Sequence, residues 1–493
     1  MNLRPLNKDA TGYALPGLAL LALGIASFTM REHVLDDTLI HTTIGRNFFL
    51  NGEFAFNPSG PFSGSSAPVY TWLVAQMGYL LAPDRWPWAL KGVGLLLQAG
   101  CLGLVLLLCR RLFAGARAGA YAFAVAALLI VFPGTTRWYQ DGMETALVIF
   151  LVLAGPVTYR LSRENPQPPW AAWLTGALLA LPVLVRIDAA PIVLTYGCWL
   201  LIDRERRIAI WLGYGATFLM GLLLPVMLYG ALLPPSGSAK QAGSWVWGFL
   251  PAFIRVVAIA TPFLLLGPLV TLGLCLKGRL MEWVKGIVAW FPLAFILAYG
   301  IYKGQSVQGA RYFMPALMAG WLLTLILYSR GIRDLFQHSA LVRKAGVGAL
   351  TLVCLANAAL VVPVTQRINR IQYAWPDRLL EPGKRIASWD IGYLGWYTPN
   401  LIIDFSGLIH GEAIARADRQ NEPRSALLIQ RFGWPDYVVA IPGRGQRLDE
   451  GALLIHGPEG QVRPYQLIDT VYLKGTGQLH SEVFADPENL PPG

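Results

Sequence analysis

Residues 208–230 read IAIWLGYGATFLMGLLLPVMLYG and hold no charged side chain. Coiled as a helix, a run of this length crosses the ~30 Å hydrocarbon core of a lipid bilayer. The residues just before it, DRERR at 203–207, form a basic loop of the kind that stays on the cytoplasmic side. The combination predicts a membrane-spanning helix rather than a helix of a soluble core.

Similar apolar runs recur along the chain and predict about eleven transmembrane helices. They lie at 13–30, 88–109, 118–133, 142–159, 170–185, 189–202, 208–230, 253–276, 286–302, 312–329 and 345–363. The stretch 67–82 is ambiguous, because counting it as a span would move most of the basic loops to the outer side. We therefore expect it to lie along the outer membrane interface as an amphipathic segment.

The composition agrees with this topology. Of 493 residues, 55% are hydrophobic and only 14% charged, which argues against a soluble enzyme. The net charge of +11 would suggest nucleic acid as a partner in a soluble protein. Here the whole basic excess lies before Pro363, mainly on the predicted inner loops, so it sets the topology and we expect no nucleic-acid partner.

The residues after Pro363 form a second region of mixed polar composition. Short apolar segments start at 385, 401, 437 and 466, and they alternate with helix-like stretches at 412–420 and 424–432. This pattern predicts a small α/β domain. We expect an all-α polytopic membrane domain at 1–363, with a first outer loop at 31–87, followed by an extracytoplasmic α/β domain at 364–493.

The first outer loop holds an acidic pair, Asp36 and Asp37, directly after the first span. Ionised groups at a membrane surface are costly unless they are paired or serve a site. Adjacent carboxylates point in different directions, so one could act on substrate while the other pairs with a cation. The alternative is that either residue is the N-cap of a helix over 38–50.

Polar groups at the other outer loops complete a candidate site. They are Arg137, Tyr139 and Glu144 in one loop, Arg186 and Asp188 in another, and Lys240, Lys303 and Arg311 further on. Carboxylates with scattered cations on one face suit a substrate that carries a phosphate and hydroxyl groups. A carboxylate could then act as base on an acceptor hydroxyl or stabilise an oxocarbenium-like state.

Several other kinds of site have no support in the sequence. The chain lacks a phosphate-binding glycine loop, and it has no HExxH or GxSxG motif. Its five cysteines show no CxxC spacing, so we expect neither a zinc site nor a disulfide framework. The sequence identifies no definite cofactor; outer-face carboxylates could hold a divalent cation through oxygen ligands, but no dedicated ligand spacing demands one.

At these residues the sequence resembles the GT-C superfamily of membrane glycosyltransferases, in particular its polyprenyl-phosphate-dependent arabinofuranosyltransferase and mannosyltransferase branch. The resemblance covers most of the chain. It is carried by DDTLIHTTIGRNFFLNGEFAFNPSG from Asp36, RWYQDGMETAL from Arg137, LVRIDAAPI from Leu184, GARYFMPAL from Gly309, ASWDIGYLGWYTPNLIIDFSGLIHGEAIA from Ala387 and GWPDYVVA from Gly433. The segment at 64–68, GSSAP, departs from the branch, where several members carry YTSP, and leaves the sugar and the acceptor open.

The resemblance implies catalysis by Asp36 or Asp37 on the outer face of a bacterial inner membrane. It implies a polyprenyl-phosphate sugar as donor, and a glycan, a lipid or a protein as acceptor. Arg186 and Arg311 become candidates for holding the donor, together with Arg137, Lys240 and Lys303. Further candidates are His41, Tyr139, Glu144, Asp188 and Asp390; Asp404 also matches a motif position.

Two other functions stay open at this point. A transporter or flippase of lipid-linked sugars would explain the many spans and the basic loops. It gives no reason for the acidic pair, and no internal repeat is evident. A membrane scaffold whose C-terminal region binds a partner would make that region essential and the acidic pair dispensable.

Overall fold

The computed structural model describes most of the chain. It covers residues 36–57, 65–113, 133–164, 167–230, 266–276, 280–303, 310–338, 381–406, 423–440, 446–447, 452–472 and 479–487, with single positions or short stretches at 17–34, 119–131, 278, 379 and 409.

The chain gathers into two compact units. The first, here called the helical unit, comprises Met1–Arg31, Lys91–Leu224 and Ser244–Thr365; the second, the sheet unit, comprises Glu32–Leu90, Pro225–Gly243 and Gln366–Gly493. The first loop therefore folds with the C-terminal residues, although the sequence analysis assigned it to the membrane domain. The expected boundary at Pro363 lies outside the described residues and stays a prediction.

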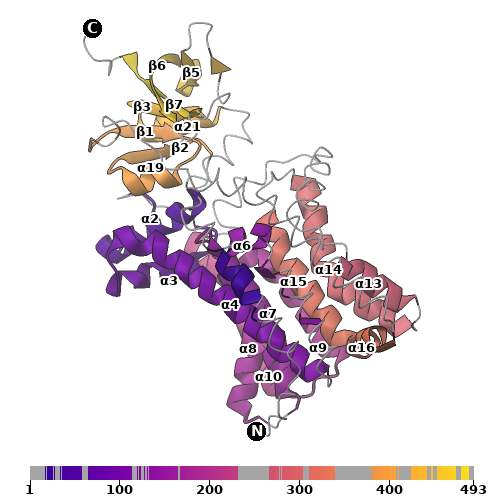
Figure 1. Cartoon of the computed structure of the whole chain (residues 1–493). Helices are drawn as coiled ribbons and strands as arrows, with labels where there is room; N and C mark the ends of the chain where they lie inside the picture. Colours follow the sequence, from indigo (N-terminus) through magenta and orange to yellow (C-terminus); the bar gives the residue numbers. More distant parts are fainter. Residues whose placement is uncertain are drawn as a thin grey trace. The chain divides into compact units, whose positions relative to one another are not determined.

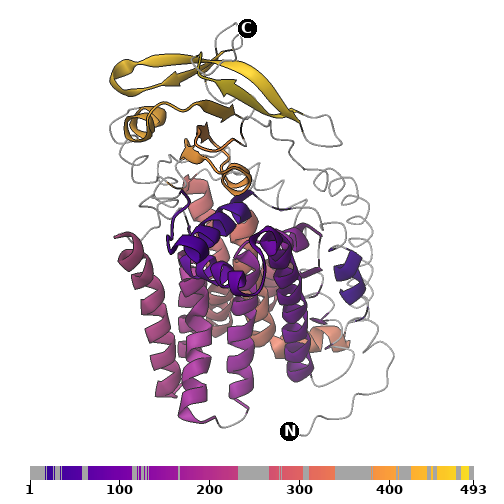
Figure 2. The same cartoon turned by 90° about the vertical axis from the view of Figure 1, so that its left-hand side faces the viewer.

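Long apolar helices run side by side through the helical unit (Figures 1 and 2). The described helices that lie wholly or mainly in it are α4 (Trp86–Leu112), α6 (Pro133–Gln140), α7 (Thr145–Ser162), α8 (Pro169–Val185), α9 (Ala190–Ile202), α10 (Ile208–Tyr229), α13 (Leu266–Cys275), α14 (Leu280–Lys303), α15 (Ala310–Leu327) and α16 (Ser329–His338).

Four described segments are long and apolar enough to cross a membrane: Pro83–Leu112, Thr145–Ser162, Ile208–Tyr229 and Leu280–Ala298. Three shorter apolar helices accompany them, at Pro169–Val185, Ile187–Ile202 and Phe313–Leu327. The expected span at 345–363, and parts of those at 13–30, 118–133 and 253–276, lie outside the described residues. The protein is thus a multi-pass helical protein, and the expected number of about eleven spans is not confirmed.

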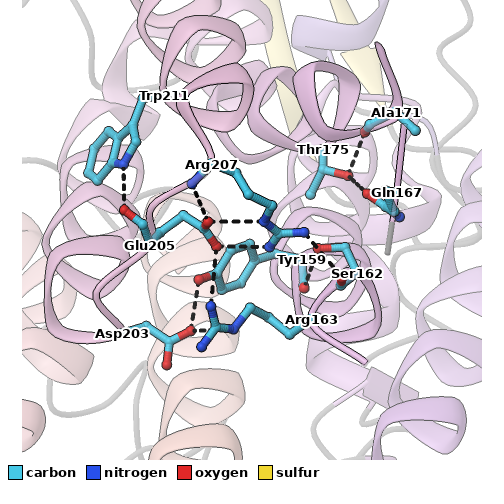
Figure 3. A network of polar contacts seen from close by, with 10 residues as sticks. All are labelled: Tyr159, Ser162, Arg163, Gln167, Ala171, Thr175, Asp203, Glu205, Arg207 and Trp211. Carbon is cyan, nitrogen blue, oxygen red and sulfur yellow. Dashed lines mark hydrogen bonds and ion pairs between the residues drawn. The ribbon is translucent and has the colours of Figure 1, made fainter. Parts of the chain in front are cut away.

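One end of α7 is joined to the turn between α9 and α10 by a network of partly buried ion pairs and hydrogen bonds (Figure 3). Arg207 binds Glu205 through Nε–Oε1 at 3.0 Å and Nη2–Oε2 at 2.8 Å, and its Nη1 donates to the carbonyl oxygen of Ser162 at 3.1 Å. Tyr159 donates to the Asp203 carboxylate at 2.7 Å. The residues at the C-terminal end of α7 and the turn at 203–207, both expected on the inner side, therefore meet at the same end of the helices.

The sheet unit contains a seven-stranded sheet in the order β2-β1-β3-β7-β6-β5-β4. Its strands are β1 (Arg385–Ser388), β2 (Leu401–Asp404), β3 (Tyr437–Ala440), β4 (Gln446–Arg447), β5 (Leu453–His456), β6 (Val462–Tyr472) and β7 (Leu479–Ala485). The strands β1, β2 and β3 are parallel, and the others pair antiparallel. The parallel strands are short continuous apolar runs, as expected of strands covered on both faces.

Helices cover both faces of this sheet. On one face, β-strand residues such as Ile386 and Val439 pack with Ile40 and Ile44 of α2 (Asp36–Asn51) and with Leu394 of α19 (Gly392–Tyr397). The other face packs against α21 (Arg424–Phe432). The first loop thus supplies part of the hydrophobic core of the C-terminal sheet, which explains why the two fold as one unit.

The segment expected at the interface, 67–82, forms α3 (Pro68–Gln76) and the 3-10 turn Met77–Tyr79. At 1.5 Å per residue, α3 is about 14 Å long, which is too short to cross a bilayer. It packs against α2 inside the sheet unit. Its place on the membrane surface stays a prediction.

Two glycines allow α19 to sit directly on the first loop. A Cβ at Gly392 would lie 1.9 Å from the backbone oxygen of Asp36, and a Cβ at Gly395 would lie 2.1 Å from the ring of Phe56. Real side chains do not approach this closely. The DIGYLG motif at 390–395 is therefore required by packing, whatever else it does.

We predict that Gly392→Ala destabilises the protein by about 1–3 kcal/mol, because a methyl group must push α19 away from α2. The matched control is Gly103→Ala on α4, where a Cβ meets nothing within 4 Å and which we expect to be neutral or slightly stabilising. Thermal unfolding of the two purified variants decides this. Equal unfolding temperatures would show that α19 does not depend on the close contact.

Candidate active site

The carboxylate of Asp36 binds the start of α19. Its Oδ2 accepts the backbone N–H of Gly392 at 3.0 Å, and its Oδ1 accepts that of Tyr393 at 2.8 Å. The first N–H groups of a helix have no partner inside it, and a negative charge there is favourable. Asp36 is in the first turn of α2, which begins two residues earlier than expected, so the cap it provides is for α19 and not for its own helix.

The pKa of Asp36 is raised to about 7. Burial of the carboxyl group is the main cause, followed by the negative charges of Asp390 and Asp37; the two backbone N–H groups act in the opposite direction. Three carboxylates thus lie close enough to influence one another. A carboxylate with a pKa near neutrality is a much stronger base than an ordinary aspartate.

The other end of α19 is held by Arg46, also on α2. Its guanidinium donates to the carbonyl oxygens of Gly395 and Trp396, both at 3.1 Å, and lies over the Trp396 ring at 4.6 Å. A cation at the C-terminus of a helix is as favourable as an anion at its N-terminus. Asp36 and Arg46 therefore fix α19 from both ends, and the guanidinium of Arg46 is bound to the helix carbonyls.

In the helical unit, the structure brings together three predicted site residues. Arg186 donates through Nη1 to Glu144 Oε1 at 2.6 Å and through Nε to Asp188 Oδ1 at 2.9 Å, with a second contact from Nη2 to Asp188. The side chains of Arg186 and Glu144 are 8% and 1% exposed, so this pair is buried. Two carboxylates balance the charge of Arg186 and hold its orientation.

A second set of charges in this unit includes a residue that the sequence analysis did not select. Lys91 on α4 is buried, and both Lys91 and Arg137 interact electrostatically with Asp141. Arg137 also lies over the ring of Trp138 at 5.2 Å. Lys91 is the one charged residue inside the apolar run 88–109, and an ionisable residue within a span indicates function. That signal was available in the sequence.

Three other candidates lie in buried positions of the described structure. His41 is buried in α2, where its Nδ1 lies 2.7 Å from Thr71 Oγ1 and its ring packs edge-on against Tyr70. Tyr139 is fully buried. Asp404 accepts the N–H groups of Ser406 and Ile409 and so closes the turn after β2.

The remaining candidates cannot be placed. Lys240 and the side chains of Lys303 and Arg311 lie outside the described residues. Within the described part of the chain, no three His, Cys, Asp or Glu side chains are arranged to hold a metal ion.

Known proteins share this architecture. Residues 364–484 match a family described as "Domain of unknown function (DUF8728)". A protein of Mycobacterium tuberculosis (strain ATCC 25618 / H37Rv), named terminal beta-(1->2)-arabinofuranosyltransferase, is 26% identical over 90% of this chain and 71% of its own length. Two crystal structures of ArnT from Cupriavidus metallidurans cover 98% of this chain and all of theirs. The one bound to undecaprenyl phosphate has a TM-score of 0.53 at 13% identity, and the apo structure has 0.50 at 14%.

The chain therefore shares the fold of the two ArnT structures and is similar over most of its length to a glycosyltransferase. The two crystal structures establish the fold. The sequence similarity to the curated relative extends over nearly the whole chain. In this chain, two motifs of the resemblance, GMET and RID, bind each other through Glu144 and Arg186.

We predict that Glu144→Ala destabilises the protein by about 3–5 kcal/mol. The buried guanidinium of Arg186 then keeps only one of its two carboxylate partners, Asp188. The control is Glu164→Ala, which removes an exposed partner of Arg160 and should cost less than about 1 kcal/mol. Thermal unfolding measures both. In a double-mutant cycle, Glu144→Ala with Arg186→Ala should be less destabilising than the sum; additive effects would contradict a direct pair.

Proposed function

We propose that this enzyme transfers a sugar from a polyprenyl-phosphate donor to an acceptor hydroxyl on the outer face of a bacterial inner membrane, with Asp36 as the base. The observation that carries the proposal is the Asp36 carboxylate, which is oriented by two backbone N–H groups and has a pKa near 7. A strongly shifted pKa with a specific structural cause is typical of catalytic groups. The ArnT structure bound to undecaprenyl phosphate supports this class of donor.

In the proposed reaction, Asp36 accepts the proton of the acceptor hydroxyl as its oxygen attacks the anomeric carbon of the donor sugar. The new glycosidic bond forms while the bond between that carbon and the phosphate oxygen breaks. Polyprenyl phosphate leaves with the bonding electrons. The nearby charges of Asp37 and Asp390 favour the proton on Asp36, and they also stabilise the positive charge that develops on the sugar ring.

Within the helical unit, the cations that we propose for binding an anionic group of a substrate are Lys91 and Arg137, and the charge of Asp141 acts on both. Arg186, in contrast, is balanced by Glu144 and Asp188. Its proposed role is to hold the outer ends of α6–α7 and α8–α9 together, and a direct phosphate contact would require it to exchange one of these partners.

The name of the curated relative favours a pentofuranose such as arabinofuranose as the transferred sugar. Another pentose or a hexose fits the same chemistry. The acceptor is proposed to be a component of the cell envelope, a glycan, a lipid or a protein, and the sheet unit is proposed to lie on the extracytoplasmic side.

Asp36→Asn removes the base while keeping the size of the side chain. We expect kcat/KM for transfer from a polyprenyl-phosphate sugar to fall by about 10²–10⁴. The matched control is Asp84→Asn, an exposed aspartate of the same loop, which should keep wild-type activity. Circular dichroism and thermal unfolding exclude misfolding as the cause. Retained activity in folded Asp36→Asn would remove Asp36 from catalysis.

Asp390→Asn tests the electrostatic environment of the base. Removing this negative charge lowers the pKa of Asp36 from about 7, and the deprotonated carboxylate is the active form. The acid limb of the kcat/KM–pH profile should therefore move to lower pH, with the enzyme gaining activity relative to its maximum near pH 6. An acid limb that stays in place would show that Asp36 does not control it.

A further inference from the structure

The outward face of α19 carries two aromatic rings. Tyr393 and Tyr397 are one helical turn apart, and their rings are nearly parallel, with 6.3 Å between centroids and 12° between planes. Tyr397 is 55% exposed, whereas its neighbours Gly395 and Trp396 are buried against the rest of the sheet unit. We call this stacked pair, with Tyr397 as its exposed ring, the tyrosine platform.

The platform is rigid because α19 is fixed from both ends. Asp36 holds its first N–H groups, and Arg46 holds its last carbonyls. The Tyr393 hydroxyl also donates to the backbone oxygen of Val34. An aromatic residue on a fixed backbone loses less conformational entropy when a ligand packs on it than one on a mobile loop.

The platform adjoins the proposed base. The backbone N–H of Tyr393 itself donates to Asp36, and Tyr397 lies about 6 Å further along the helix, at 1.5 Å per residue. A sugar ring bound on Tyr397 is therefore close to Asp36. One and the same ligand molecule can contact both residues.

The local charge indicates which ligand fits. Asp36, Asp37 and Asp390 are acidic, and the guanidinium of Arg46 is already bound to α19. The phosphate group of the donor would be repelled by this surface and is expected to lie away from it. A neutral sugar is suited to it, because its C–H face packs on an aromatic ring and its hydroxyls donate hydrogen bonds to carboxylates.

We propose that Tyr393 and Tyr397 form a stacking subsite for a sugar residue of the acceptor, and hence that the acceptor is a glycan. This rests on the proposed function. It narrows the acceptor from glycan, lipid or protein to the first of these, and it makes the sheet unit part of the acceptor site. The sugar next to the one that receives the new bond would lie on Tyr397.

Binding of neutral oligosaccharides to the full-length enzyme in lipid nanodiscs tests the subsite without any donor. The probes are an arabinofuranose hexasaccharide and a mannose hexasaccharide, measured by saturation-transfer NMR and titration. We expect Tyr397→Ala to weaken binding of the better probe about five- to tenfold. Tyr397→Phe keeps the ring and should bind like wild type, whereas Tyr397→Leu should bind like Tyr397→Ala.

The matched control is Tyr79→Ala, which removes a tyrosine of the same unit that is 78% exposed and should leave binding unchanged. Equal binding by wild type and Tyr397→Ala would overturn the subsite, as would a wild type that binds neither probe at millimolar concentration. Such a result would make Tyr397 a membrane-surface anchor instead. Transfer to a lipid or peptide acceptor that is unaffected by Tyr397→Ala would also overturn it.

Transfer assays separate this inference from the proposed function. In a glycan acceptor assay, Tyr397→Ala should raise KM for the acceptor with little change in kcat, whereas Asp36→Asn lowers kcat. If folded Asp36→Asn transfers normally while Tyr397→Ala still weakens oligosaccharide binding, the catalytic proposal fails and the subsite stands. If Asp36→Asn is inactive and Tyr397→Ala leaves both binding and KM unchanged, the subsite fails and the catalytic proposal stands.

Discussion

The contact between the Asp36 carboxylate and the first N–H groups of α19 organises the sheet unit. It joins residues more than 350 positions apart in the chain, and it places the proposed base against the C-terminal sheet. The contact depends on Gly392, because any side chain there would displace α19. Ile40 and Ile44 then bury the inner face of α2 in the core of the sheet. The first loop and the C-terminal region are therefore one folded structure.

The two units differ in how they use charge. In the sheet unit, carboxylates gather around Asp36, and the cation Arg46 is bound to helix carbonyls. In the helical unit, cations and carboxylates pair at both ends of α7, which is about 27 Å long at 1.5 Å per residue. Glu144 and Arg186 lie at one end, and the network of Glu205 and Arg207 lies near the other. Ion pairs at both ends hold the apolar helices in register, where hydrophobic packing alone is unspecific in lipid.

Many motif residues that resemble those of the GT-C superfamily form structural contacts in the fold. Asn57 pairs with both backbone groups of Ile402 on the edge strand β2, and Asp404 closes the turn after that strand. Asp436 accepts the backbone N–H of Arg385 at the start of β1. From the sequence, a motif aspartate that binds backbone and one that binds substrate look the same. Only their partners distinguish them, and those partners are remote in the chain.

The sequence alone determined the local features: apolar spans such as 208–230, the strands beginning at Arg385, Leu401 and Tyr437, and the helix at 424–432. These follow from periodicity and composition, which are properties of neighbouring residues. It also located the acidic pair, since charge beside a span is conspicuous. The tertiary structure decided that Asp36 caps α19, that Arg186 is neutralised by Glu144, and that β7 inserts between β3 and β6. Each of these joins distant segments through burial and backbone hydrogen bonds, for which no local pattern exists.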